Sequence, residues 1–236
     1  IRITMKMTLK AISITVAMFL GVMSNSVAQS FEPTTSWPYI YPDFIQGQLI
    51  MTSGKTLTGL YNICLEGSTL HFIEGEMVKE ASTLDIISVQ IGNDIYVNAG
   101  GKIIKTVGKA EKGVVAVESI IDMAKLNETG GAYGSSSSTN ATMSLSSLEG
   151  IGGRANMNHM ELKNAKESGR VLPIITKYYL VFNGKSVPAN KKDIDALKGI
   201  DKDALKSYYK SNKIKWRDPA SLCSLIDFIA KQQSTL

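Results

Sequence analysis

Hydrophobic and polar positions alternate in short runs through residues 46–121, and glycine and asparagine residues separate the runs. Leu70 and Phe72 fall on one side of such a run and His71 falls on the other, because successive side chains of a β-strand point to opposite faces. Several short runs of this kind, each ended by a turn residue, are typical of antiparallel strands with one face on a core. We therefore predict an antiparallel β-rich domain.

The clearest hairpin lies in residues 87–97. Ile87, Val89 and Ile91 repeat the alternation, the Gly-Asn-Asp sequence at residues 92–94 suits a turn, and the pattern then restarts. With the neighbouring runs, roughly five to seven strands are expected. No window of about 30 residues holds a strand, a long helix and a second strand, so a parallel βαβ sheet is not expected. A meander, a roll or a small barrel is predicted instead.

The C-terminal part mixes two patterns. Met160 and Leu162 alternate with polar neighbours, and residues 171–182 are rich in β-branched and aromatic side chains, so both stretches predict strands. The Asn-Gly pair at residues 183–184 predicts a hairpin turn. These strands form either a second, smaller sheet or an extension of the first.

Three helices are predicted near the C-terminus. A short one covers residues 193–200, Asp201 caps the second, and Asp218 with Pro219 begins the third. The apolar positions of the third helix share one helical face. They are Leu222, Leu225, Ile226 and Ile229. The chain is therefore expected to be an α+β protein, with a β-rich domain followed by a smaller part of strands and helices.

Residues 1–28 have the pattern of a secretory signal peptide. Three basic residues precede an apolar run at residues 11–22, and Ser26 and Ala28 place small side chains where signal peptidase cuts. The apolar run is shorter than the roughly 20 residues that span a bilayer. We expect an exported chain, periplasmic or extracellular, without a transmembrane segment after cleavage.

Composition divides the rest of the chain. Residues 29–126 hold an aromatic N-terminal arm and the β-domain, residues 127–153 form a Gly/Ser-rich linker or loop, and residues 154–236 form the C-terminal part. Removing residues 1–28 takes away three of the 26 basic residues and none of the 21 acidic ones, so the formal charge falls from +5 to +2. The strong basicity of the whole chain thus comes partly from the signal peptide.

Positive charge gathers in residues 185–217, which contain ten basic and four acidic side chains. Lys202, Lys206, Lys210 and Lys213 follow helical spacing. Clustered lysines attract anionic lipid surfaces, glycans such as lipopolysaccharide, and acidic envelope proteins. The alternative is a solvated face whose aliphatic stems cover apolar surface. No recognition module for nucleic acid is present, and the pattern predicts no particular oligomeric state.

Residues 36–44 form the aromatic arm, with Trp37, Tyr39 and Tyr41 among its rings. Its two prolines favour extended backbone in the residues that precede them. The arm either presents its rings to a carbohydrate or lays them on the β-domain. The second interpretation is favoured, because nothing in the sequence turns the rings outward.

The sequence contains few groups suited to catalysis. His71 and His159 lie in no metal-ligand spacing, no Gly-x-Ser-x-Gly elbow is present, and a Cys64–His71 dyad would have to form across a turn-rich segment. A disulfide between Cys64 and Cys223 is permitted in an exported protein, whereas their apolar surroundings favour two packed thiols. We predict no metal, no cofactor and no catalytic residue, and acidic residues such as Asp85 are interpreted as turn and edge positions.

Four short strings are similar to a known group of proteins. They are Ser-Trp-Pro-Tyr at residues 36–39, Asn-Glu-Thr-Gly-Gly-Ala-Tyr-Gly at 127–134, Lys-Tyr-Tyr-Leu-Val-Phe at 177–182 and Lys-Ile-Lys-Trp at 213–216. Together they resemble a family of exported proteins of Bacteroidetes-type bacteria. The resemblance implies a Gram-negative periplasm or cell exterior, and it implies no activity.

These observations lead to one functional expectation and one alternative. We expect an exported, non-catalytic binding or interaction module of the bacterial cell envelope, which uses the aromatic arm and the lysine-bearing helices. The alternative is a periplasmic or secreted hydrolase that acts on carbohydrate through carboxylates dispersed in the sequence.

Overall fold

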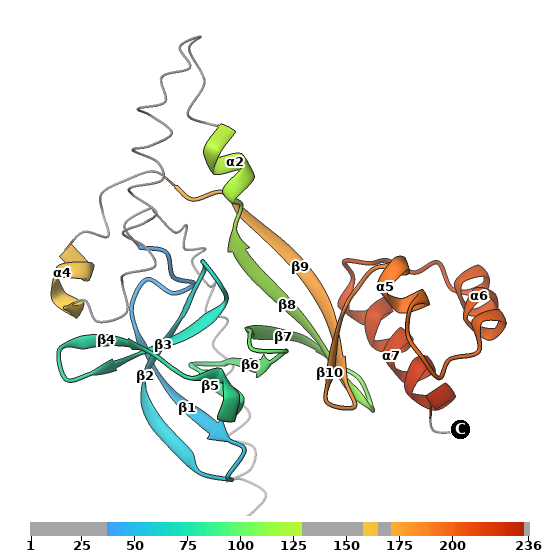
Figure 1. Cartoon of the computed structure of the whole chain (residues 1–236), viewed down its shortest axis with the longest axis horizontal. Helices are drawn as coiled ribbons and strands as arrows, with labels where there is room; N and C mark the ends of the chain where they lie inside the picture. The colour runs from blue at the N-terminus through green and yellow to red at the C-terminus, as the bar shows by residue number, and fades with distance from the viewer. Residues whose placement is uncertain (1–36, 129–157, 165–170, 234–236) are drawn as a thin grey trace, which may run out of the picture. The chain divides into compact units, whose positions relative to one another are not determined.

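The computed structural model describes residues 37–128, 158–164 and 171–233 (Figure 1). The expected signal peptide at residues 1–28 and most of the expected linker at residues 127–153 lie outside this part of the chain. Within it, every helix is too short or too polar to span a bilayer.

Ten strands form a single sheet in which all neighbouring strands are antiparallel. They are β1 (Ile45–Met51), β2 (Thr56–Cys64), β3 (Thr69–Glu74), β4 (Met77–Glu80), β5 (Ile86–Ile91), β6 (Asp94–Asn98), β7 (Ile103–Lys109), β8 (Gly113–Ile121), β9 (Ile174–Phe182) and β10 (Lys185–Pro188). Their order in the sheet is β10-β9-β8-β7-β6-β5-β1-β2-β3-β4. The predicted α+β class with an antiparallel β-rich part is confirmed, and β9 and β10 extend the first sheet.

Of the six described helical elements, α5, α6 and α7 lie near the C-terminus (Figure 1). They are the 3-10 turn η1 (Thr83–Asp85) and the helices α2 (Met123–Glu128), α4 (His159–Asn164), α5 (Lys191–Asp195), α6 (Lys202–Ser211) and α7 (Pro219–Gln233). Asp201 accepts hydrogen bonds from the N–H groups at the start of α6, and Asp218 accepts one from Ser221 N–H at the start of α7. Both predicted caps are therefore confirmed.

The prediction of a strand around Met160 is wrong, because His159–Asn164 is the short helix α4. The side chain of Asn158 accepts a hydrogen bond from Met160 N–H at 2.9 Å, as an N-cap residue does. Four alternating residues are too few to distinguish a strand period of two from a helical period of 3.6. The cap therefore decides the conformation.

Strands β1 to β5 curl into a roll. In a flat sheet of order β5-β1-β2-β3-β4, the outer strands would lie about 19 Å apart, yet residues 81–85 join them and include the compact turn η1. The backbone of this connection bonds to both sides, since Ala81 N–H donates to Leu70 O and Thr52 N–H donates to Asp85 O, each at 2.8 Å. The apolar residues of the inner face then pack together with Tyr96 of β6 and Ile103 of β7. The buried residues of this core are Leu49, Tyr61, Ile63, Leu70, Ile86, Val89, Ile91, Tyr96 and Ile103.

A β-bulge changes which isoleucine of β5 faces this core. Ile50 pairs with Ser88 and Met51 pairs with Ile86, so Ile87 has no partner of its own on β1. Ile86 is consequently buried and Ile87 is exposed, contrary to the alternation expected at Ile87, whereas Val89 and Ile91 are buried as expected.

Helix α7 covers one face of the part of the sheet formed by β7, β8 and β9. Leu222, Leu225 and Ile226 on α7 are fully buried against a core that includes Val115 and Leu180 of β8 and β9. A close approach makes this contact possible at Gly108, where an added Cβ would lie 2.8 Å from Cys223 Sγ.

The sheet has two edge strands, and both are short. Strand β4 has four residues, and Met77 at its start forms an isolated bridge with Asn158. Strand β10 also has four residues, beginning with Lys185 and ending with Pro188.

Candidate functional site

The aromatic arm is packed inside the protein. Trp37 and Tyr39 are both 0% exposed, and their ring centroids lie 5.2 Å apart. Tyr39 forms an isolated antiparallel β-bridge with Cys64, the last residue of β2. The arm therefore runs beside the end of β2, next to the part of β2 that pairs with β1. The rings of the arm therefore lie on the β-domain, as the favoured interpretation of the sequence predicted. Neither Trp37 nor Tyr39 is presented to a carbohydrate.

A buried asparagine clamps the arm to β2. The Asn62 amide donates to Tyr41 O at 2.9 Å and to Asp43 O at 3.0 Å, and its carbonyl oxygen accepts from Tyr41 N–H at 3.1 Å. Asn62 is 0% exposed, so these bonds replace the water that its amide would otherwise require. Sequence reasoning missed this residue, although a polar side chain inside the apolar end of a strand was the available signal.

Tyr41 closes one end of the roll. Its hydroxyl donates to Asp94 Oδ2 at 2.6 Å and lies 2.7 Å from the Tyr96 hydroxyl, while Lys105 Nζ lies 2.8 Å from the same carboxylate oxygen. Burial and the neighbouring Asp94 hold the pKa of Tyr41 well above its ordinary value, so the phenol stays protonated as a donor. We call this arrangement the closed end.

His71 links the arm to β4. Its Nδ1 lies 2.9 Å from the Tyr39 hydroxyl and its Nε2 lies 3.2 Å from Glu80 Oε2. Burial lowers the pKa of His71 below its ordinary value and outweighs the opposing effect of Glu80. The neutral ring can then accept from Tyr39 at Nδ1 and donate from Nε2–H to Glu80.

The remaining candidate metal and thiol residues are also placed. His159 stacks edge-on against Phe44, whose ring also contacts Tyr39, so the fold brings the two histidines to one aromatic cluster. Among the described residues, no three His, Cys, Asp or Glu side chains gather as metal ligands would. Cys64 and Cys223 are not joined by a disulfide, since the first lies in this cluster and the second on α7.

The opposite end of the roll is open and holds a cavity of about 250 Å³. We call it the roll mouth. Apolar side chains make up most of its lining, with polar residues contributed by the connection from β4 to β5. The lining residues are Leu49, Met51, Leu57, Tyr61, Phe72, Glu80, Ala81, Ser82, Asp85 and Ile86.

The ring of Tyr61 forms an inner wall of the roll mouth. Its hydroxyl donates to Leu57 O at 3.1 Å, so the ring lies along β2 towards the opening. Two paired glycines make room for it, because a Cβ at Gly47 would lie 3.0 Å from the ring and one at Gly59 would lie 3.3 Å from it. The cavity wall is therefore fixed by backbone positions that carry no side chain.

The charged residues that line the roll mouth are both acidic. Glu80 ends β4 and has a side chain 51% exposed, while Asp85 ends η1 and is also exposed. No lysine or arginine is among the lining residues. The roll mouth thus combines an apolar interior with negative charge.

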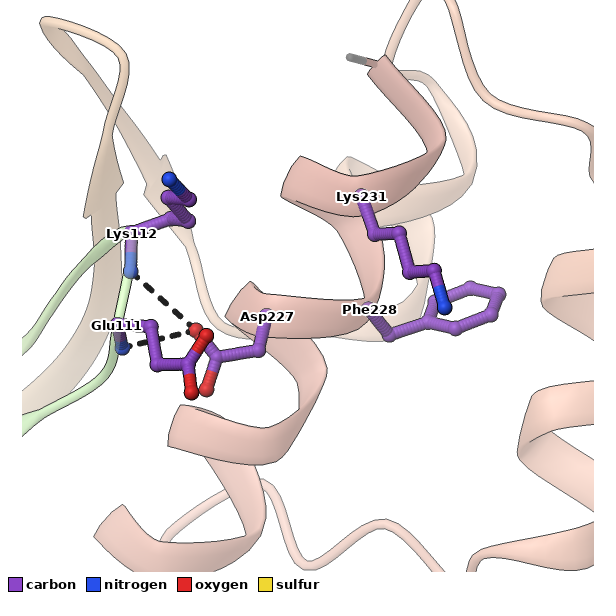
Figure 2. A pocket seen from close by; sticks show the side chains of 5 residues that line it. All are labelled: Glu111, Lys112, Asp227, Phe228 and Lys231. Carbon is purple, nitrogen blue, oxygen red and sulfur yellow. Dashed lines mark hydrogen bonds between the residues drawn. The ribbon is translucent and has the colours of Figure 1, made fainter. Parts of the chain in front are cut away.

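A second cavity, of about 520 Å³, is lined by residues of the β7–β8 turn and of α7 (Figure 2). Figure 2 shows Glu111 and Lys112 on the turn and the other lining residues, Asp227, Phe228 and Lys231, on α7. Asp227 Oδ1 accepts from the backbone N–H groups of Glu111 and Lys112 at 2.9 and 3.3 Å. This carboxylate joins the turn to the helix, and the lining has two acidic and two basic side chains.

The predicted lysine residues are exposed, and three of them lie on one helix. Lys202, Lys206 and Lys210 belong to α6, whereas Lys213 follows the end of that helix. Lys206 forms an ion pair with Asp203 at 3.1 Å. None of these four lysines lines either of the two cavities described above. Trp37, Tyr39 and Tyr41 pack with residues of the roll, so the fold does not bring the predicted aromatic and lysine residues together.

Comparison of the chain with protein-family models, with curated proteins and with solved structures gives no match.

Proposed function

We propose that the protein is an exported, non-catalytic binding module of the bacterial cell envelope, and that it binds a small apolar group in the roll mouth. One observation carries this proposal: an apolar cavity of about 250 Å³ opens at one end of a roll whose other end is closed. Mouths of β-barrels and similar rolls are frequent ligand sites, because the strands hold the walls rigid. The acyl, alkyl or aromatic part of an envelope molecule is the occupant.

The cavity size limits the ligand. Small-molecule pockets usually measure about 300–1,000 Å³, so a cavity of about 250 Å³ admits one chain or ring rather than a large molecule. The remainder of the ligand would extend past Ser82 and Asp85 into solvent.

Titration with a neutral apolar fluorescent probe, N-phenyl-1-naphthylamine, tests the proposal. The chain from residue 29 onwards is expected to give a saturable increase in fluorescence. Leu57→Trp fills the cavity and is expected to lower the affinity at least tenfold. Leu60→Trp is the matched control, because Leu60 lies on the same strand but is 40% exposed and absent from the lining. Absence of saturable binding, or equal loss in both variants, would contradict the proposal.

A contact between α6 and an anionic partner is proposed as part of the same module. The described β-rich part, residues 37–128, has seven basic and eleven acidic side chains, whereas residues 185–233 have eleven basic and six acidic ones, giving −4 and +5. Asp201 and Asp218 are engaged as helix caps and Asp227 binds a turn, so these carboxylates lie against backbone N–H groups. The exposed lysines therefore dominate the charge that an approaching anion meets.

Sedimentation with vesicles tests this contact. Vesicles containing anionic phosphatidylglycerol are expected to retain the protein, and vesicles of phosphatidylcholine are not. The double variant K202Q/K210Q is expected to reduce retention several-fold, and added salt should do the same, because exposed charges are screened over about 10 Å at 0.1 M. K55Q, on the β1–β2 turn, is the control. Retention that is unaffected by salt would assign the contact to another surface.

A carbohydrate hydrolase is the second candidate function. It is favoured by one observation, the presence of Glu111 and Asp227 in the lining of the larger cavity. Hydrolysis of an envelope polysaccharide that is abolished by Glu111→Gln, with unfolding unchanged, would support this candidate over the binding module.

A further inference from the structure

We infer that the ligand of the roll mouth is a hydrophobic amine, whose apolar part enters the cavity and whose ammonium group contacts Glu80 and Asp85. This inference rests on the proposed function and adds the charge of the ligand to it.

The charges of the lining residues determine which ligand charge is favoured. The two ionisable side chains on the rim are carboxylates, and the rest of the lining is neutral. A fatty acid would bring a third carboxylate to this rim, and repulsion between like charges opposes that. An ammonium group is attracted instead and can donate up to three hydrogen bonds to carboxylate oxygens.

His71 positions Glu80 without cancelling its charge. The 3.2 Å contact joins Nε2 of the buried ring to Oε2 of the carboxylate. Since burial favours the neutral ring, His71 places no positive charge beside this carboxylate. Within the described part of the chain, Oε1 of Glu80 has no hydrogen-bond partner, so it is available to a ligand.

Asp85 supplies the second carboxylate from a fixed backbone position. Its carbonyl oxygen accepts from Thr52 N–H at 2.8 Å, which ties η1 to the β1–β2 turn. Its side chain makes no ion pair among the described residues. Because Ile86 follows directly and lines the cavity, Asp85 lies where an apolar tail emerges from the roll.

Competition between three ligands with the same tail provides the test. Decylamine, decanol and decanoate are each titrated against protein that holds N-phenyl-1-naphthylamine, at concentrations below those at which they form micelles. The displacement of the probe gives the affinity of each ligand. An ion pair at an exposed rim contributes at most about 1 kcal/mol, which corresponds to about fivefold in affinity. We therefore expect decylamine to bind about fivefold more tightly than decanol, and decanoate to bind more weakly than decanol.

Substitutions then assign this preference to the two carboxylates. The double variant E80Q/D85N is expected to bind decanol as the unmodified protein does, but to lose its preference for decylamine. Glu74→Gln is the matched control, because Glu74 is an exposed carboxylate at the end of β3 outside the lining. It should keep the preference.

The possible results separate the two proposals. If decylamine and decanol bind equally, or if the preference persists in E80Q/D85N, the inference is overturned while the roll mouth remains a ligand site. If neither the probe nor any of the three ligands binds, the proposed function fails, and the inference fails with it.

Discussion

The two ends of the roll are built from the same strands but have different chemistry. At the closed end, Asn62 binds the arm through several hydrogen bonds, Tyr41 of the arm donates to Asp94 on β6, and aromatic rings fill the space beside them. At the roll mouth, the connection through η1 passes the opening and leaves a cavity lined by Leu57 and Phe72. The arm is therefore the segment that closes one end of the roll, while the other end keeps an open cavity in the described chain. Substitutions at the closed end should therefore affect stability, and substitutions at the roll mouth should affect binding.

The largest expected effect is at the clamp of the closed end. Asn62→Leu removes three hydrogen bonds to the arm and a fourth from Ile63 N–H, and it leaves the Tyr41 and Asp43 backbone groups without these partners. Each bond contributes about 1 kcal/mol net, so the free energy of unfolding should fall by about 2 to 4 kcal/mol. Urea denaturation measures the change. Asn93→Ala, in an exposed turn, should cost less than about 0.5 kcal/mol. Similar losses in the two variants would show that Asn62 is not a clamp.

A smaller effect is expected where the cavity wall meets the sheet. An alanine Cβ at Gly47 would lie 2.4 Å from Gln90 O, a backbone atom that cannot rotate away, and 3.0 Å from the Tyr61 ring. Gly47→Ala should therefore lower the free energy of unfolding by about 1 to 3 kcal/mol. It should also weaken probe binding, because Tyr61 must shift. At Gly67 an added Cβ meets only ordinary contact at 3.5 Å, so Gly67→Ala should leave stability and binding unchanged.

The smallest expected effect is a dependence on pH that originates beside the arm. Burial lowers the pKa of His71 in the folded protein, so the unfolded chain binds a proton more readily. Well above pH 6.5 the ring is neutral in both states and contributes no pH dependence. As the pH falls below that value, stability should decrease until the folded-state pKa is passed, and then level off.

His71→Gln should flatten this profile, measured as the urea midpoint between pH 7.5 and pH 5. The groups that face the ring are Tyr39 from the arm, Glu80 from β4 and Thr69 from β3 itself. Because burial also lowers the pKa of His159, the slope that remains in His71→Gln should be reduced further in the double variant His71→Gln/His159→Gln. A profile that is unchanged by His71→Gln would contradict the assignment.

Local patterns in the sequence predicted the elements whose signals are local. The turn at residues 92–94 and the caps Asp201 and Asp218 are where the residues indicated, because each depends on neighbours a few positions away. Ile87 could not be predicted, since a bulge is decided by pairing with β1. The strand predicted at Met160 failed for a related reason, because four residues do not define a period.

The roll mouth could not be predicted from patterns of neighbouring residues in the sequence. Leu57, Phe72 and Ile86 come from three strands, and only the curl of the sheet brings them to one cavity. Asp85 was interpreted as a turn residue, which is correct for its backbone, but its place in the lining depends on the same curl. For Trp37 the sequence favoured a ring that lies on the β-domain, but which residues surround that ring depends on the fold.

The edge strands have a consequence for association between copies of the protein. An open sheet exposes backbone N–H and C=O groups along its edges, and a further strand can add there and begin aggregation. On β10, Pro188 lacks an N–H group and Lys185 brings a charge, so that edge is a poor template. On β4, Asn158 already bridges to Met77 and α4 follows directly, which blocks the start of that strand. The short, interrupted edges therefore favour a sheet that stops at ten strands rather than one that grows into a fibre.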